Sequence, residues 1–110
     1  TRSSWVTGVQ TCALPISLMN AQQLQDNGYE IKLIFEGKAV KWPAALAEQN
    51  NQLYQQAKEK GILAGICQGC ARMLQVYEAS VKTGLPMLSD MSGHAGMKPL
   101  IDDGYEVILA

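Results

Sequence analysis

The sequence predicts an α/β fold in three layers, with helices on both faces of a parallel sheet. Short apolar runs rich in β-branched residues alternate along the chain with segments of helical spacing. This alternation is typical of βαβ units, in which crossover helices join parallel strands. The 110 residues suffice for one domain, and a hydrophobic share of 47% with a charged share of 17% describes a globular protein.

The expected elements follow one another without a repeat or a flexible linker. In chain order they are the tail of a helix over 17–27, a strand at 29–35, helices at 41–50 and 53–60, a strand at 61–66, a helix from 71 to about 82, a short strand at 85–88, a helix at 97–103 and a strand at 105–109. Asn27-Gly28 and Thr83-Gly84 are typical helix ends. Pro43 fits the first turn of its helix.

Two of these elements frame a Cys-x-x-Cys motif. The run 61–66 is apolar and free of charge, as a strand covered on both faces should be. From residue 71 the spacing becomes helical, with an apolar stripe made by Met73, Leu74, Tyr77 and Val81. Cys67 and Cys70 should therefore lie where a strand ends and a helix begins.

Backbone N–H groups and the helix dipole stabilise a thiolate at such a position, which favours a redox or sulfur-handling dithiol. The alternative is a pair of small buried hydrophobic residues. Gln68 and Gly69 weigh against it, because packing alone would not need an amide and a glycine at the turn. A zinc half-site is less favoured, since no second Cys-x-x-Cys or His pair supplies four ligands. We expect no metal and no cofactor.

Ligand sites in parallel sheets lie beyond the carboxyl ends of the strands. Three predicted segments reach that edge: 36–37, 67–70 and 89–94. The last contains His94, the only histidine of the chain, which can act as a general base or lower a thiol pKa. An exposed loop histidine without a role is the alternative. Asp90 and Ser92 are expected to cap the following helix, and Glu36 to cap or to accept hydrogen bonds.

Composition excludes several classes of protein. A net charge of −1 and a pI of about 5.7 give no basic surface, so no nucleic acid is expected as a partner. No run approaches the roughly 20 apolar residues of a membrane span, and no signal peptide opens the sequence. Three cysteines without a secretory signal favour free thiols in the cytoplasm.

The first residues read differently from the rest. The stretch 6–16 resembles the translation of a widely used sequencing adaptor, and it shows no regular period. We therefore interpret residues 1–16 as a non-native segment joined to a truncated gene, and residues 17–110 as a single domain that is incomplete at its N-terminus. On this interpretation Cys12 plays no part in function.

With these segments in order, the chain resembles the DsrE-like family of small cytoplasmic proteins linked to sulfur relay. The resemblance covers residues 17–110. It rests on four segments: Gly28-Tyr29-Glu30 leading to Phe35-Glu36-Gly37, Gly65 to Cys70, Gly84-Leu85-Pro86 leading to Ser89 to His94, and Gly104 to Ile108. It implies a doubly wound, flavodoxin- or Rossmann-like arrangement with a five-stranded parallel sheet, and assembly into homo- or hetero-oligomers.

The family also has a cysteine after the third strand that carries sulfur as a persulfide in relay members, and Cys67 matches it. Cys70 matches a second cysteine that some members have. The family's first strand would precede Ser17, between the strands at 31–35 and 105–109. We expect it to be missing here, residues 1–16 to be irregular or to form at most a token strand, and the polypeptide therefore to be unstable.

The leading hypothesis is a sulfur carrier of the sulfurtransferase type. Cys67 would accept sulfane sulfur from a donor protein and pass it to an acceptor, with Cys70 as the resolving thiol, Arg72 as an electrostatic aid and His94 in the same site. Cys67 should be the more reactive thiol. A Cys-x-x-Cys dithiol oxidoreductase is the second hypothesis, although thioredoxin-like sheets are mixed. A non-enzymatic oligomeric interaction subunit with structural cysteines is the third.

Overall fold

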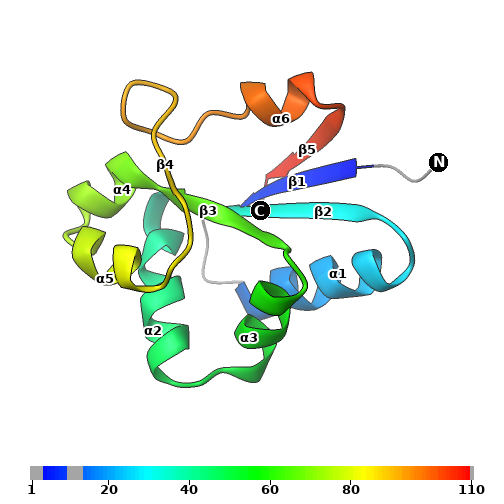
Figure 1. Ribbon diagram of the computed structural model, residues 1–110, viewed down its shortest axis with the longest axis horizontal. Helices are drawn as coiled ribbons and strands as arrows, with labels where there is room; N and C mark the ends of the chain where they lie inside the picture. The colour runs from blue at the N-terminus through cyan, green and yellow to red at the C-terminus, as the bar shows by residue number, and fades with distance from the viewer. Residues whose placement is uncertain (1–3, 10–13, 110) are drawn as a thin grey trace.

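The computed structural model describes the backbone of residues 4–9 and 14–109 and the side chains of residues 18–106. Its strands form one parallel sheet in the order β4-β3-β2-β1-β5 (Figure 1). They are β1 (Ser4–Val9), β2 (Glu30–Phe35), β3 (Leu63–Cys67), β4 (Met87–Leu88) and β5 (Tyr105–Leu109). The helices are α1 (Leu14–Asp26), α2 (Trp42–Glu48), α3 (Gln52–Glu59), α4 (Gln68–Met73), α5 (Tyr77–Lys82) and α6 (Lys98–Asp102), with a short 3-10 helix η1 (Gly37–Lys41) before α2.

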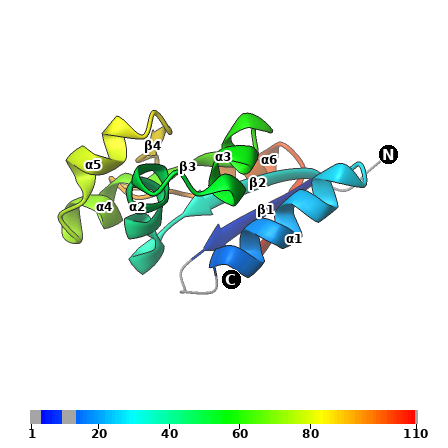
Figure 2. The same ribbon diagram turned by 90° about the horizontal axis from the view of Figure 1, so that it is seen from below.

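Helices lie on both sides of this sheet, which confirms the predicted three-layer α/β/α fold. α1, α2 and α3 lie on one side of the central strands, and α6 lies on the other (Figure 1 and Figure 2). The strand order explains this division. From β1 to β4 the chain moves in one direction across the sheet, so right-handed crossovers fall on one face. It then returns past β1 to β5, and α6 falls on the opposite face.

The expectation of a missing first strand is wrong. Ser4–Val9 forms β1, which pairs with β2 along its whole length and with β5 from Ser4 to Gly8. A strand between two neighbours satisfies its N–H and C=O groups on both sides. The gap on which the expected instability rested is therefore filled.

The helix end predicted at Asn27-Gly28 is confirmed. Gly28 has a φ of 92°, and its N–H donates to the carbonyl of Gln25, while the Tyr29 N–H reaches back to the carbonyl of Leu24. These two bonds form a Schellman motif, which needs a left-handed residue that glycine adopts without strain. The turn leads directly into β2, as expected from the sequence.

The single helix expected from residue 71 to about 82 is wrong. The chain forms α4 and α5 instead, with a break at which Gln75 has a φ of 60°. The predicted apolar stripe is broken as well, because Met73 is 75% exposed and Val81 is 47% exposed. Leu74 and Tyr77 do pack against the core. The break leaves α4 as a short helix that carries one of the two cysteines.

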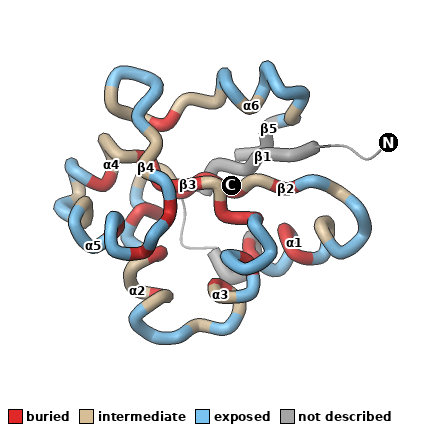
Figure 3. Tube along the Cα trace, in the orientation of Figure 1, coloured by how far each residue is buried: buried red, intermediate tan, exposed pale blue. Residues whose placement is uncertain are grey.

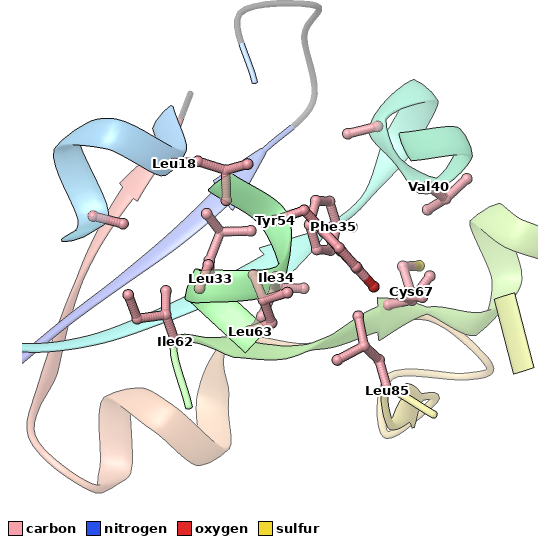
Figure 4. Packing of buried hydrophobic residues seen from close by; sticks show 14 of the residues in the cluster. Leu18, Leu33, Ile34, Phe35, Val40, Tyr54, Ile62, Leu63, Cys67 and Leu85 are labelled. Atoms are coloured by element: carbon pink, nitrogen blue, oxygen red, sulfur yellow. The ribbon is translucent and has the colours of Figure 1, made fainter. Parts of the chain in front are cut away.

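Buried residues run along β2 and β3 and continue into the helices α1, α2 and α3 (Figure 3). Leu33, Ile34 and Phe35 follow one another in β2 and are each at most 1% exposed, as in a strand covered on both faces. Tyr54 of α3 packs into the same cluster, which extends along β3 to Cys67 (Figure 4). Among the described helices, none combines the length and the apolar character that crossing a membrane requires.

The central place of β1 can be tested with proline. Thr7 lies opposite Leu33 of β2 and Ile108 of β5, and proline cannot donate to a ladder in the middle of a sheet. We expect Thr7→Pro to lower the free energy of unfolding by at least about 2 kcal/mol, measured by urea denaturation. Thr1→Pro, which lies before the strand, is the matched control. Equal stability of both variants would contradict a central strand over Ser4–Val9.

Candidate functional site

The candidate site lies where connections from two neighbouring strands leave in opposite directions. The chain leaves β3 into α4, and it leaves β4 through the loop 89–97 toward α6 on the other face (Figure 1). In open α/β sheets such a switch point forms a crevice beyond the carboxyl ends of the strands, where ligands bind. Here the two connections bring together the Cys-x-x-Cys motif and the loop that carries His94.

Cys67 is the last residue of β3 and the N-cap residue of α4. It is only 2% exposed. The backbone N–H of Ala95 donates to its Sγ atom at 3.3 Å. This bond fixes the position of the sulfur at the end of the strand. Cys67 is thus a buried sulfur with a donor directed at it.

Cys70, in the first turn of α4, is half-buried, and both cysteines are free thiols. Burial raises the pKa of the Cys70 thiol above its ordinary value, and a hydrogen bond to Cys67 raises it further, with a smaller contribution from the charge of Glu36. A backbone hydrogen bond from Gly37 acts in the opposite direction. Cys70 is therefore harder to deprotonate than an ordinary thiol, and its attack needs a base nearby.

His94 lies against both sulfurs. Its Nδ1 atom is 3.3 Å from Sγ of Cys67 and 3.7 Å from Sγ of Cys70. The expectation that His94 lies at the same edge as Cys67 is confirmed, and the contact is direct. In its neutral form the ring nitrogen accepts or donates one hydrogen bond, and in its charged form it donates to a thiolate. Its catalytic role stays a prediction.

A glycine makes room for this histidine. A Cβ atom added to Gly69 would lie 2.5 Å from Cε1 and 2.6 Å from Nδ1 of His94. The ring therefore occupies the space that any other side chain at position 69 would fill. The Gly69 N–H also donates to the carbonyl of Gly93 at 2.7 Å, which ties the helix to the loop.

The loop that presents His94 is held by its own hydrogen bonds. Met91 and His94 exchange two backbone bonds of 2.8 and 2.9 Å around Ser92 and Gly93, whose φ values are 50° and 92°. Two successive positive φ values are typical of a type I′ turn. Asp90 accepts from the Gly96 N–H at 3.0 Å. The expectation that Asp90 and Ser92 cap the next helix is wrong, since α6 begins after Met97 without a side-chain cap.

A small cavity opens beside Cys70. It has a volume of about 170 Å³ and is lined by Gly37, Lys38, Cys70, Met73 and Leu74. The first two residues belong to η1, which sequence reasoning did not anticipate. Cys67 does not line it. The sequence-based expectation that Cys67 is the more reactive thiol assumed an open position for its sulfur. In the structure Cys67 is the covered thiol, and Cys70 is the one at the cavity.

Arg72 and Glu36 were also expected near the site, and neither belongs to the cluster of the two sulfurs and His94. The guanidinium of Arg72 stacks over the ring of Tyr77, 4.0 Å from its centroid, so its predicted aid to Cys67 gains no support from this contact. Glu36, at the end of β2, acts on Cys70 through its charge. Sequence reasoning missed the Ala95 N–H donor, for which no sequence signal exists. It noted Gly69, whose position between two cysteines was the available signal.

The three side chains offer a compact set of donor atoms. The two sulfurs and a nitrogen of His94 all lie within 4.8 Å of one another. Among the described residues, these three form the cluster of cysteine, histidine and carboxylate side chains close enough to bind one metal ion. Such a set can hold a thiophilic metal ion, exchange sulfur between thiols, or move a proton between sulfur and nitrogen.

Comparison with known proteins finds one curated relative of this chain. It is similar to a protein of Methanocaldococcus jannaschii that bears the name Uncharacterized protein MJ0733, with 34% identity over 95 residues. The match covers 84% of the chain and 75% of the relative. No protein-family model matches the sequence, and no solved structure does.

The contact between Gly69 and His94 predicts a non-additive effect of mutation. Gly69→Ala should lower the free energy of unfolding by about 1–3 kcal/mol, because the ring must be displaced. In a His94→Ala background the same change should cost much less, since its partner in the clash is gone. Urea denaturation of the unaltered protein, both single variants and the double variant gives the four free energies of unfolding that this double-mutant cycle needs. Additive free energies would contradict the placement of the ring over Gly69.

The burial of the two thiols predicts the order in which they react. A bulky maleimide should label Cys70 before Cys67, because the reagent must reach the sulfur and Cys67 is 2% exposed. Peptide mapping of the Cys12→Ser variant after partial labelling gives the order without interference from the third thiol. First labelling at Cys67 would contradict the covered position of Cys67 in the structure.

Proposed function

This chain belongs to the same family as protein MJ0733 of Methanocaldococcus jannaschii, and we propose that it is a sulfur carrier which holds sulfane sulfur as a persulfide on Cys67. The relative's name gives no activity, so the proposal rests on the site. The observation that carries it is the pairing of one buried and one accessible thiol on a single histidine nitrogen.

The accessible thiol gives sulfur a route into the site. Cys70 borders the cavity of about 170 Å³, whereas Cys67 is 2% exposed and does not line it. In line transfer between two sulfurs requires a separation somewhat longer than two S–S bonds, which is about 4–5 Å. The sulfurs of Cys67 and Cys70 lie within 4.8 Å of one another. A sulfur atom on Cys70 is thus within reach of Cys67.

The transfer is a sequence of two thiol exchanges without net oxidation. The Cys70 thiolate attacks the outer sulfur of a donor persulfide, R–S–SH; the donor S–S bond breaks and its electron pair leaves with R–S⁻. The Cys67 thiolate then attacks the outer sulfur of Cys70–S–SH, and Cys70 leaves as a thiolate. An acceptor thiolate discharges Cys67 by the same two steps in reverse order.

The surroundings supply what each step needs. His94 Nδ1 is 3.7 Å from Sγ of Cys70 and 3.3 Å from Sγ of Cys67. In the first exchange it can take the proton of Cys70 and give it to the departing R–S⁻. In the second it can take the proton of Cys67 and give it to Cys70 when Cys70 leaves. The Ala95 N–H stabilises the negative charge on Cys67. Burial of Cys67 keeps its persulfide away from small thiols in solution, which would otherwise remove the sulfur.

The partners follow from this chemistry and from the resemblance to DsrE-like proteins. A sulfur-donor protein and a sulfur-acceptor protein would each dock at the cavity beside Cys70, and the chain would act as a homo- or hetero-oligomer. The cytoplasm, where thiols are kept reduced, is the compartment in which such a carrier works. No nucleic acid, membrane or resident cofactor takes part in this proposal.

The dithiol oxidoreductase is less well supported. Every described strand pair of the sheet is parallel, whereas thioredoxin-like sheets are mixed. The interaction-subunit hypothesis does not account for a histidine ring placed over a glycine between two cysteines. Both hypotheses give distinct results in the experiment below.

Incubation with a cysteine desulfurase and cysteine should add one sulfur atom to the Cys67 peptide, detected by mass spectrometry. Cys70→Ser should slow loading by about tenfold or more, since the donor must then reach a buried sulfur. Cys67→Ser should leave an adduct on Cys70 that small thiols remove quickly. Cys12→Ser is the matched control and should load normally.

Other outcomes would replace this proposal. Reduction of protein disulfides with turnover and no sulfur adduct would point to the oxidoreductase. Identical behaviour of Cys67→Ser, Cys70→Ser and the unaltered protein would point to structural cysteines. Stable storage on Cys70 with Cys67 unmodified would exchange the roles of the two thiols.

A further inference from the structure

We infer that Cys67, Cys70 and His94 form a binding site for one zinc ion, with three protein ligands and a fourth position open. This site uses the side chains of the proposed sulfur carrier but does not depend on that function. The sequence disfavoured zinc because the chain lacks a second Cys-x-x-Cys or a histidine pair. The fold brings the single histidine to the cysteines and completes a Cys₂His set.

The distances match those of a tetrahedral zinc site. With Zn–S bonds of about 2.3 Å and a Zn–N bond of about 2.0–2.1 Å, a tetrahedron places sulfur and nitrogen about 3.6 Å apart and the two sulfurs about 3.8 Å apart. Nδ1 of His94 is 3.3 Å from Sγ of Cys67 and 3.7 Å from Sγ of Cys70, and all three ligand atoms lie within 4.8 Å. Only small side-chain adjustments are needed to enclose an ion.

The donor types select the metal. Two thiolates and an imidazole suit zinc, whereas magnesium and calcium prefer oxygen ligands. The ligand group contains no carboxylate among the described residues. Three protein ligands with an open fourth position are typical of reactive zinc sites, since structural zinc sites have four protein ligands.

The surroundings fix the ligands as an outer shell does in metal sites. The Ala95 N–H donates to the sulfur of Cys67 at 3.3 Å, and N–H···S bonds orient a thiolate ligand. The Gly69 N–H bond to Gly93 and the close approach of the His94 ring to Gly69 hold the loop in place. The cavity beside Cys70 gives a water molecule or an external thiol access to that ligand.

Zinc and sulfur loading would then exclude each other, because both use the same sulfur lone pairs. Binding releases the protons of both thiols as Zn²⁺ takes their place, and no oxidant or reductant is required. A bound zinc ion would protect the pair from oxidation and from persulfide formation. The amount of available zinc would therefore determine how much of the protein can carry sulfur.

The test is a titration of the reduced, metal-free full-length chain with Co²⁺, followed by displacement with Zn²⁺. We expect one equivalent of cobalt to give a thiolate-to-cobalt charge-transfer band and the intense d–d bands of tetrahedral coordination. Zinc should abolish both. Competition with a chromophoric chelator then gives the zinc affinity of each variant.

His94→Gln, Cys67→Ser and Cys70→Ser should each weaken zinc binding by more than about 100-fold, since loss of an outer-shell partner alone costs about 10–100-fold. Cys12→Ser should bind as the unaltered chain does. Circular dichroism of each variant separates a lost ligand from a lost fold, and the cobalt spectrum of the unaltered chain stands without any variant.

A weak octahedral cobalt spectrum of the unaltered chain, or full zinc affinity in folded His94→Gln, would overturn the inference. Sulfur loading is measured in parallel on metal-free protein. A tetrahedral cobalt spectrum without a sulfur adduct would support the zinc site and would contradict only the proposal that the chain carries sulfur. A sulfur adduct without tetrahedral cobalt overturns the zinc site alone.

Discussion

The close approach of β4 and its loop to β3 and α4 is the constraint on which the site depends. Two glycines permit it. A Cβ atom at Gly65 would lie 2.7 Å from the carbonyl oxygen of Pro86 and 2.8 Å from Leu88, and a Cβ atom at Gly69 would meet the ring of His94. Larger residues at these two positions would push β4 away from β3 and the His94 loop away from α4. Sulfur and imidazole would then no longer be in contact.

This constraint also makes the two cysteines unequal. Cys67 ends a buried strand and is enclosed by the loop, so it receives the Ala95 N–H and the His94 ring. Cys70, three residues later, lies on the wall of the cavity with η1. Their separation suits both exchange of a sulfur atom and binding of a metal ion. Exchange needs two sulfurs in reach of each other with a base nearby, and a metal ion needs two sulfurs and a nitrogen around one point, and all three atoms lie within 4.8 Å of one another. A simple packing role would require neither the histidine nor the glycine beneath it.

The placement of the first strand shows how a sheet uses a segment with little pattern of its own. Residues 4–9 have no clean alternation, and from sequence we expected them to be irregular or to form at most a token strand. β1 nevertheless lies between β2 and β5 and pairs with both. A central position supplies hydrogen-bond partners on two sides, and this tertiary gain outweighs weak local propensity. For the helix expected from residue 71 to about 82 the reverse holds: the local pattern is regular, and yet the backbone breaks at Gln75, whose φ is 60°.

The sequence by itself determined the α/β class, most element positions from residue 17 on, and the meeting of the Cys-x-x-Cys pair with the His94 loop at one edge. These follow from periodicity, from turn residues such as Gly28, and from the geometry of parallel strands, all of which are local or topological. Only the tertiary structure decided which thiol is covered, that Asp90 braces the loop instead of capping a helix, and that Ala95 donates to Cys67. Those outcomes depend on contacts between residues 20 or more positions apart, or on how a loop closes. The hydrophobic pattern of the sequence predicts neither.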